Sequence, residues 1–322
     1  TFLSYQEEAR ENRMYFKNYK YFLAIVEYGG VTRAAEALFL SQPSLSKYLR
    51  RLEQNLGIEL FDHSSSPLKL TFAGQRYYEY IKRFESLERQ FDDELGSIRD
   101  DDSGEIRMGI AQWRGSILLP TLIPRFHEVY PHVEINIVEG RAMQIETALV
   151  QGRVDLCLMN LPSHFPAQTN QEILWNEKCL LVGNRNHSVI QKALQTTPIS
   201  ADGYRNIDIR FLEQEHFISL MPGQNMTLAM ERLFAANNLT PKSIWRTENL
   251  STALNMVSET MCFTMMPEVG ARVKFLPDNL EYFSISHSEE LLSFSAVYRK
   301  DFVLNRWIHT LLDLARQVYA KF

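Results

Sequence analysis

The stretch from Val31 to Leu56, VTRAAEALFLSQPSLSKYLRRLEQNL, decides the fold of the N-terminal part of the chain. It predicts two helices joined by a tight turn, with Thr32 in a position to cap the first helix. Pro43 fits the first turn of the second helix, where a missing N–H leaves no hydrogen bond unmade. The second helix carries one apolar stripe with helical spacing, formed by Leu45, Leu49, Leu52 and Leu56.

The opposite face of this second helix is polar and cationic. Ser46, Lys47, Arg50 and Gln54 point away from the leucines, and no acidic residue occurs between Ser41 and Leu52. Such a helix suits the major groove of DNA, because Lys and Arg contact phosphates and guanines while Ser and Gln reach base edges. A basic helix face is more often plain solvated surface. The short helix-turn-helix spacing and the proline favour DNA binding here.

Charge is distributed unevenly along the chain. The 322 residues carry a formal net charge of −5, with 45% hydrophobic and 23% charged residues, as in globular proteins of two or three domains. Residues 14–84 hold ten Lys or Arg against six Asp or Glu, a local balance of +4 that leaves −9 for the remainder. A polyanionic partner is therefore expected at the N-terminal part.

Cysteine and histidine usage predicts no metal or disulfide framework. Cys157, Cys179 and Cys262 lie far apart, and the eight histidines are scattered without ligand spacing. We expect reduced thiols in a cytoplasmic protein, no cofactor, and an inert thiol at Cys262 in preference to a redox sensor. Neither a signal peptide nor a run of about 18 apolar residues is present, so no membrane association is expected.

The remaining N-terminal elements complete a small domain over residues 14–72. Residues 1–13 form a polar leader or extension to which we assign no role. A first helix ends at Gly29-Gly30, and Gly57 ends the second helix of the pair. Residues 62–67 predict a turn and residues 68–71 a short extended arm, which together make a small wing.

A linker helix is predicted over residues 73–99. About 26 residues would span roughly 39 Å, and their apolar side chains recur at alternating steps of four and three. Such a seam favours pairing with the same helix of a second copy, although packing against the chain's own core is the alternative. The residues of this predicted dimerisation seam are Tyr77, Ile81, Phe84, Phe91, Leu95 and Ile98.

Beyond a charged hinge at residues 100–104, the pattern changes to alternating strands and helices over residues 105–322. The alternation predicts parallel sheets in two α/β lobes, with lobe I over 105–165 and 282–322 and lobe II over 166–281. Segments that cross between two such lobes make a hinged cleft, a common place for a small ligand.

The cleft should be lined by strand ends and helix starts. Backbone N–H groups there favour an anionic ligand. Simple helix capping is the alternative role of Ser116, a surface salt bridge that of Arg114, and core packing that of Met265. The candidate residues are Gln112, Trp113, Arg114 and Ser116 in the first lobe, and Met221, Gln224, Asn225, Thr227 and Met265 in the second.

A family resemblance extends along nearly the full chain from Met14. The chain resembles LysR-type transcriptional regulators. In the N-terminal part the resemblance rests on Ala34-Ala35 with Leu38, Ser41-Gln42-Pro43 with Ser46, Leu52-Glu53, Gly57 with Leu60-Phe61, and Leu70-Thr71 with Ala73-Gly74. Farther on it rests on Leu119-Pro120, Phe126, Tyr130-Pro131, Glu139-Gly140 and Gly152 with Val154-Asp155-Leu156.

The resemblance implies a multi-domain α+β protein with a winged helix-turn-helix, a dimerising linker helix and a two-lobed periplasmic-binding-protein-like effector domain. It implies double-stranded DNA as a partner, a homodimer or homotetramer, and a small-molecule effector that controls activation or repression, with RNA polymerase as a further partner in activation. It assigns DNA contact to Thr32, Arg33, Gln42, Pro43, Ser44, Ser46, Lys47, Arg50 and Arg51, and leaves Lys69 as the cation of the wing.

The chain departs from the family pattern at several positions. His63 and Ser66 stand in the wing where arginines are common, and Ala142 stands where a hydroxyl residue often faces the effector. Thr260 and Cys262 replace a glycine pair. A small-molecule-binding protein or an enzyme without a DNA role is the alternative function, but the chain has no Gly-x-Ser-x-Gly, His-Glu-x-x-His or phosphate-loop motif.

Overall fold

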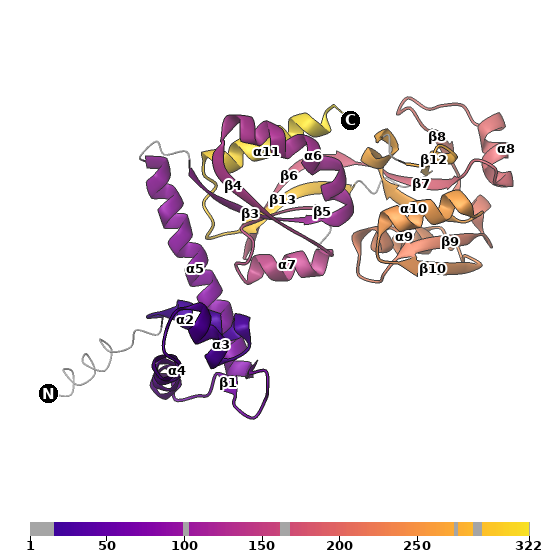
Figure 1. Cartoon of the computed structure of the whole chain (residues 1–322). Helices are drawn as coiled ribbons and strands as arrows, with labels where there is room; N and C mark the ends of the chain where they lie inside the picture. The colour runs from indigo at the N-terminus through magenta and orange to yellow at the C-terminus, as the bar shows by residue number, and fades with distance from the viewer. Residues whose placement is uncertain (1–15, 99–102, 162–167, 274–275, 286–291, 322) are drawn as a thin grey trace. The chain divides into compact units, whose positions relative to one another are not determined.

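The computed structural model describes residues 16–98, 103–161, 168–273, 276–285 and 292–321 (Figure 1). The chain divides into two compact units, residues 1–89 and 90–322. The predicted leader over residues 1–13 and most of the predicted hinge lie outside the described residues. Among the described helices, none combines the length and apolar composition needed to cross a membrane.

The first unit is a winged helix-turn-helix. Its helices are α2 (Tyr19–Tyr28), α3 (Val31–Ala37), α4 (Gln42–Leu56) and the start of α5 (Phe72–Ile98). Strands β1 (Phe61–Asp62) and β2 (Lys69–Leu70) pair antiparallel as the wing. Thr32 lies inside the first turn of α3, whose N-cap is Gly30, so the predicted capping role of Thr32 was wrong.

The predicted leucine stripe holds α4 to the core of the first unit. Leu45, Leu49 and Leu52 are buried against residues of α2, α3 and α5, and Leu56 packs at the edge of the same cluster. Glu53 is buried beside the stripe and accepts hydrogen bonds from the backbone N–H groups of Leu60 (2.8 Å) and Phe61 (3.2 Å). The helix is therefore joined to the wing as well as to the core.

Helix α5 begins in contact with the strand region of the wing. A Cβ atom at Gly74 would lie 1.9 Å from the Leu60 carbonyl oxygen, so only glycine permits this close approach. Tyr77 and Ile81 are buried in the core of the first unit, and Phe84 packs against that core.

The first half of the predicted dimerisation seam therefore belongs to the unit's own core, and this part of the prediction is corrected. Phe91 of the predicted seam is exposed, and so are Tyr80 and Leu87, which the predicted seam did not include; Phe72 at the start of α5 is exposed as well. Leu95 is half-buried, and the side chain of Ile98 lies outside the described residues.

The second unit contains lobe I, built on a five-stranded sheet. In spatial order its strands are β4 (His132–Gly140), β3 (Ser103–Ala111), β5 (Leu156–Leu161), β13 (Leu292–Arg299) and β6 (Thr169–Glu177). Helices α6 (Gln112–Val129) and α11 (Arg306–Tyr319) cover one face, and α7 (Ala142–Val150) covers the other (Figure 1). Alternate residues of β5 serve the two faces: Leu156 and Leu158 pack toward α6 and α11, whereas Cys157 and Met159 pack toward α7.

Lobe II is built on a six-stranded sheet with the spatial order β10-β9-β11-β7-β12-β8. Its strands are β7 (Cys179–Asn184), β8 (Arg205–Ile207), β9 (His216–Leu220), β10 (Ser243–Thr247), β11 (Phe263–Pro267) and β12 (Leu280–Ile285). Its helices are α8 (Ser188–Thr196), α9 (Asn225–Ala236) and α10 (Leu250–Glu259), with short 3-10 turns η1 (Ile209–Leu212) and η2 (Glu268–Arg272).

The predicted lobe boundaries were wrong at both crossings. Strand β6 pairs antiparallel with β13 along its length and so belongs to lobe I, while β12 pairs with β7 and belongs to lobe II. The chain leaves lobe I at Lys178 and returns between β12 and β13. All three cysteines are buried, Cys157 in lobe I and Cys179 and Cys262 in lobe II.

Candidate nucleic-acid interface and ligand cleft

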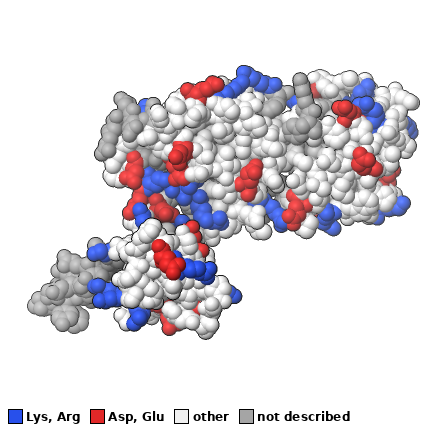
Figure 2. Space-filling model, in the orientation of Figure 1, with Lys and Arg blue, Asp and Glu red and all other residues white. Residues whose placement is uncertain are grey.

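The front of α4 presents three cations to solvent. Lys47, Arg50 and Arg51 are exposed, and within the described part of the chain their side chains form no hydrogen bond or ion pair. Figure 2 shows several Lys and Arg side chains at the surface of the first unit. Because the buried leucines fix the back of the helix, these three charges are free to contact an anionic partner.

The first turn of α4 carries a set of paired polar side chains. The Oγ atoms of Ser41 and Ser44 lie 2.7 Å apart, and the Nε2 of Gln42 donates to the Oγ of Ser46 at 2.8 Å. These contacts order the side chains and leave the side-chain oxygen of Gln42, Oε1, available as an acceptor. The arrangement resembles what direct reading of base edges requires.

The structure leaves the other predicted DNA-contact residues accessible. Thr32 and Arg33 on α3, Pro43 on α4 and Lys69 on β2 are exposed, and Ser46 is half-buried. In the wing, the Nε2 atom of His63 lies 3.2 Å from the Oε2 atom of Glu53 on α4.

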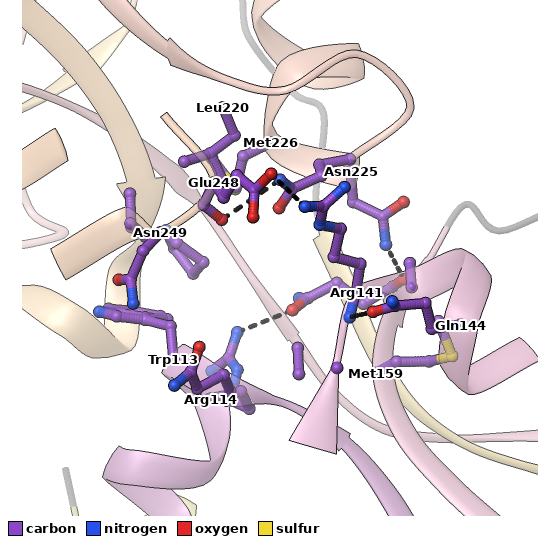
Figure 3. Close-up of a pocket in the computed structure, with 18 residues that line it drawn as sticks. Trp113, Arg114, Arg141, Gln144, Met159, Leu220, Asn225, Met226, Glu248 and Asn249 are labelled. Atoms are coloured by element: carbon purple, nitrogen blue, oxygen red, sulfur yellow. Dashed lines mark hydrogen bonds and ion pairs between the residues drawn. The ribbon is translucent and has the colours of Figure 1, made fainter. Parts of the chain in front are cut away.

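A cleft of about 480 Å³ lies between the two lobes. The first turns of four helices contribute to its wall, α6 and α7 from lobe I and α9 and α10 from lobe II (Figure 3). The lining residues are Ala111, Gln112, Trp113, Arg114, Gly140, Arg141, Ala142, Gln144, Met159, Asn160, Leu220, Gln224, Asn225, Met226, Glu248, Asn249, Leu250 and Pro267.

Two of these helix starts lack a side-chain cap. No side chain caps the first turn of α6 or of α9, whereas Asn249 accepts a hydrogen bond from the Ser251 N–H at the start of α10. The backbone N–H groups of α6 and α9 therefore add partial positive charge to the cleft from opposite lobes.

Arg114 lies at the floor of the cleft, and its charge is already neutralised. Its guanidinium pairs with the buried carboxylate of Glu177 and donates to the Asn160 side-chain oxygen at 3.0 Å. The Asn160 side-chain amide in turn donates to the Glu177 carboxylate at 3.0 Å. The backbone N–H of Val269 in lobe II donates to the same carboxylate at 3.4 Å. A buried cation requires such a partner, so Arg114 is neither the predicted surface salt bridge nor an unpaired anion ligand.

Two polar contacts cross the cleft between the lobes. Arg141, which precedes α7, forms an ion pair with Glu248, which precedes α10 (Figure 3). The side-chain amide of Asn225 donates to the Asn160 carbonyl oxygen. The first contact joins a strand-to-helix turn of lobe I to one of lobe II, and the second joins strand β5 to the first residue of α9.

Five of the nine predicted cleft residues line the cavity: Gln112, Trp113, Arg114, Gln224 and Asn225. The other four do not, and their assignment is corrected. Ser116 donates to the Trp113 carbonyl oxygen at 2.8 Å within the first turn of α6, and Thr227 is buried and donates to the Met221 carbonyl oxygen at 3.1 Å. Met265 is buried in β11, and Met221 lies outside the lining.

Sequence reasoning missed Arg141 and Glu248, the two half-exposed charges of the cleft. Both lie where a strand is followed by a helix, as do the five predicted residues that line the cavity. Applying the same rule to the turns after β4 and β10 would have found them.

A polar cluster anchors the crossing at Lys178. The Lys178 ammonium lies 2.5 Å from the Asp202 carboxylate, which also accepts a hydrogen bond from the Ser284 hydroxyl at 2.7 Å. Although burial opposes ionisation, these hydrogen bonds lower the pKa of Asp202 from 3.8 to about 2. Within the described residues there is no group of three or more His, Cys, Asp or Glu that could hold a metal ion.

Comparison with known proteins relates both units to one family. A family model for the LysR substrate binding domain matches residues 99–320, and a model for the bacterial regulatory helix-turn-helix protein, lysR family, matches residues 16–75. The chain is 25% identical over 316 residues to the transcriptional regulator BenM of Acinetobacter baylyi, covering 95% of this chain and 97% of BenM. It is 28% identical over 277 residues to the uncharacterized regulator YcgK of Bacillus subtilis, covering 81% and 82% of the two chains.

Solved structures share the fold. Full-length BenM superposes with a TM-score of 0.56 at 23% identity, covering 95% of this chain and 97% of that one. Full-length OxyR of Pseudomonas aeruginosa gives a TM-score of 0.70 at 21% identity, covering 92% of each chain.

Proposed function

Because the chain belongs to the LysR family of bacterial transcriptional regulators, we propose that it binds duplex DNA through α4 and controls transcription in response to a small molecule held in the interlobe cleft. Helix α4 is called the recognition helix from here on. A regulator of chromosomal DNA works in the cytoplasm, and activation would bring it into contact with RNA polymerase at the promoter.

The observation that carries this proposal is the two-sided character of the recognition helix. Its leucines are buried and its cations Lys47, Arg50 and Arg51 are exposed. We assign these cations to phosphates and guanines, and the ordered Gln42, Ser44 and Ser46 to base edges. Thr32, Arg33 and Pro43 complete the surface, and Lys69 of the wing contacts the backbone.

The test is binding of the full chain to the intergenic DNA beside its own gene, measured by fluorescence anisotropy against a scrambled duplex of equal length. We expect preference for the intergenic duplex and an affinity that falls steeply with salt, because neutralising several phosphates releases counterions. Equal affinity for both duplexes, or no salt dependence, would rule out sequence-specific regulation.

We also propose that the chain works as a homodimer or homotetramer. Tyr80, Leu87 and Phe91 expose apolar surface along one side of α5. A second copy of the same helix would cover these side chains. This stripe keeps Phe91 of the predicted seam and has Tyr80 and Leu87 in place of the buried Tyr77 and Ile81.

The cleft supports ligand binding without catalysis. Among the described lining residues there is no His, Cys, Ser, Thr or Lys, and the one carboxylate, Glu248, is held in an ion pair with Arg141. The uncapped first turns of α6 and α9 favour an effector that carries a negatively charged group. We therefore propose a small effector that is bound and released unchanged.

A further inference from the structure

The charges of the cleft cancel one another. Among its described lining residues, the charged side chains are Arg114, Arg141 and Glu248. Arg114 is balanced by Glu177 beneath it, and Arg141 is balanced by Glu248 across the cleft. The formal side-chain charges of the cleft therefore sum to zero before any ligand enters.

The two ion pairs differ in how readily a ligand can exchange with them. The Arg114 and Glu177 side chains are 3% and 0% exposed, so separating them would strand a buried charge. The Arg141 and Glu248 side chains are 45% and 62% exposed, and ion pairs that solvent reaches are cheap to separate. A charged ligand would therefore separate Arg141 from Glu248 and bind to them in place of their mutual contact.

The sign of the ligand charge follows from this exchange. A simple anion that took Arg141 would leave Glu248 unpaired beside it, and the two negative charges would repel. A ligand with one negative and one positive group satisfies both partners, with its carboxylate on Arg141 and its ammonium on Glu248. The charge balance of the cleft is then the same before and after binding.

The rest of the cleft wall combines large apolar side chains with the uncharged amides of Gln112, Gln144, Asn160, Gln224, Asn225 and Asn249. Trp113, Met159, Leu220, Met226 and Leu250 line it, and no further charged side chain occurs among the described lining residues. A cavity of about 480 Å³ has room for an apolar side chain in addition to the two charged groups.

We propose that the effector is an amino acid with an apolar side chain, and that Glu248 selects it over the corresponding carboxylic acid by pairing with its ammonium group. The inference rests on the proposed function, because it names the ligand class of the same cleft. Arg141 holds the carboxylate, assisted by the first turns of α6 and α9.

Matched probe sets test this inference on the full-length protein. Each set contains an amino acid, the acid that lacks its amine and the amine that lacks its carboxylate: leucine, isocaproate and isoamylamine; valine, isovalerate and isobutylamine; phenylalanine, phenylpropanoate and phenylethylamine. Thermal shift ranks the probes, and calorimetry gives the affinities of those that bind. We expect at least one amino acid to raise the melting temperature and its two partners to have little effect.

Variants identify the residues responsible. Glu248→Gln should weaken amino-acid binding roughly ten- to hundredfold, as expected for loss of one charged partner, without weakening any binding of the matched acid. Arg141→Gln should weaken binding of both. Glu259→Gln and Arg153→Gln, exposed charges outside the cleft lining, should change neither affinity.

The inference is overturned if no amino acid binds, if the acids bind as tightly as the amino acids, or if Glu248→Gln leaves amino-acid affinity unchanged. Tight binding of acids alone, together with a change in DNA affinity, would leave the proposed function intact. Failure of the protein to bind its intergenic DNA would instead count against the proposed function and not against the ligand class.

Discussion

The carboxylate of Glu53 accepts the backbone N–H of Leu60 at 2.8 Å, and this bond joins the recognition helix to the wing. The same carboxylate accepts the neighbouring Phe61 N–H, so one side chain satisfies two buried donors. A residue that makes no proposed DNA contact therefore supplies a direct hydrogen-bonded link between the helix and the wing.

Replacing Glu53 should lower stability without removing a DNA-binding charge. Glu53→Ala leaves two buried N–H groups without an acceptor, so the free energy of unfolding should fall by roughly 1–3 kcal/mol in urea titrations. Glu53→Gln keeps an acceptor oxygen and should lose less. The exposed Glu59→Ala serves as the control, and an equal loss in that variant would refute the argument.

Removing cations from the recognition helix should weaken DNA binding. For Lys47→Ala with Arg50→Ala, we expect lower affinity for the intergenic duplex and a salt slope reduced by about 1 for each lost phosphate contact. The melting temperature should stay close to that of the wild type, because both side chains are exposed.

The matched control removes two exposed charges from lobe II, with Lys192→Ala and Arg246→Ala. Its DNA affinity and salt slope should equal those of the wild type. Unchanged affinity of the Lys47→Ala, Arg50→Ala variant for the intergenic duplex would contradict the assignment of these two residues to DNA contact.

Self-association should depend on the exposed side of α5. Leu87→Asp with Phe91→Asp would bury carboxylates in an apolar contact between two copies, so light scattering should give the mass of a single chain. Ile199→Asp with Phe211→Asp, which alters two exposed apolar residues of lobe II, should leave the mass of the wild-type assembly. If the Leu87→Asp, Phe91→Asp variant also had the mass of the wild-type assembly, the exposed side of α5 would not be the contact between copies.

Ile81 distinguishes core packing from association. It is fully buried within the first unit, so Ile81→Ala should reduce the free energy of unfolding by roughly 2–5 kcal/mol. Light scattering under native conditions should still report the mass of the wild-type assembly. If Ile81→Ala instead gave the mass of a single chain with an unchanged free energy of unfolding, Ile81 would belong to the contact between copies.

Asp202 should contribute a defined part of the acid sensitivity of the fold. Because its folded-state pKa lies below its ordinary value, the contribution is fully present above about pH 3.8 and is lost as the pH falls through about 2. Asp202→Asn should therefore be less stable than the wild type at neutral pH, and the difference should shrink across that window.

Urea titrations at neutral pH and through the acid window measure this difference. Asp278→Asn, an exposed aspartate of the same lobe, controls for the loss of one negative charge. A stability gap for Asp202→Asn that persists undiminished at pH 2 would contradict the assignment.

The recognition helix could be predicted from sequence because its two faces differ so strongly. Leucines at helical spacing predict one buried face, and the cations must then lie on the opposite, exposed face. Helix α5 was harder, because apolar residues occur on two of its sides. Periodicity predicts a stripe but does not distinguish Ile81, which the unit buries, from Leu87, which it leaves exposed.

From the sequence alone, strand β6 was assigned to the wrong lobe, and Arg141 and Glu248 were not found in the cleft. Strand β6 is an edge strand with a mostly polar sequence, so it lacks the alternation that marks a half-buried strand. Arg141 and Glu248 lie far apart in sequence, and only the folded arrangement of the two lobes brings them into contact. The pairing of distant charges depends on tertiary structure that local patterns do not encode.

The burial of every cysteine gives each lobe its own internal reporter. A thiol-reactive dye cannot reach Cys157 until lobe I opens, nor Cys179 or Cys262 until lobe II opens. Mass spectrometry of timed labelling would then resolve which half loosens first and whether an amino acid slows one half more than the other. The wild-type chain thus supports this measurement without any engineered label.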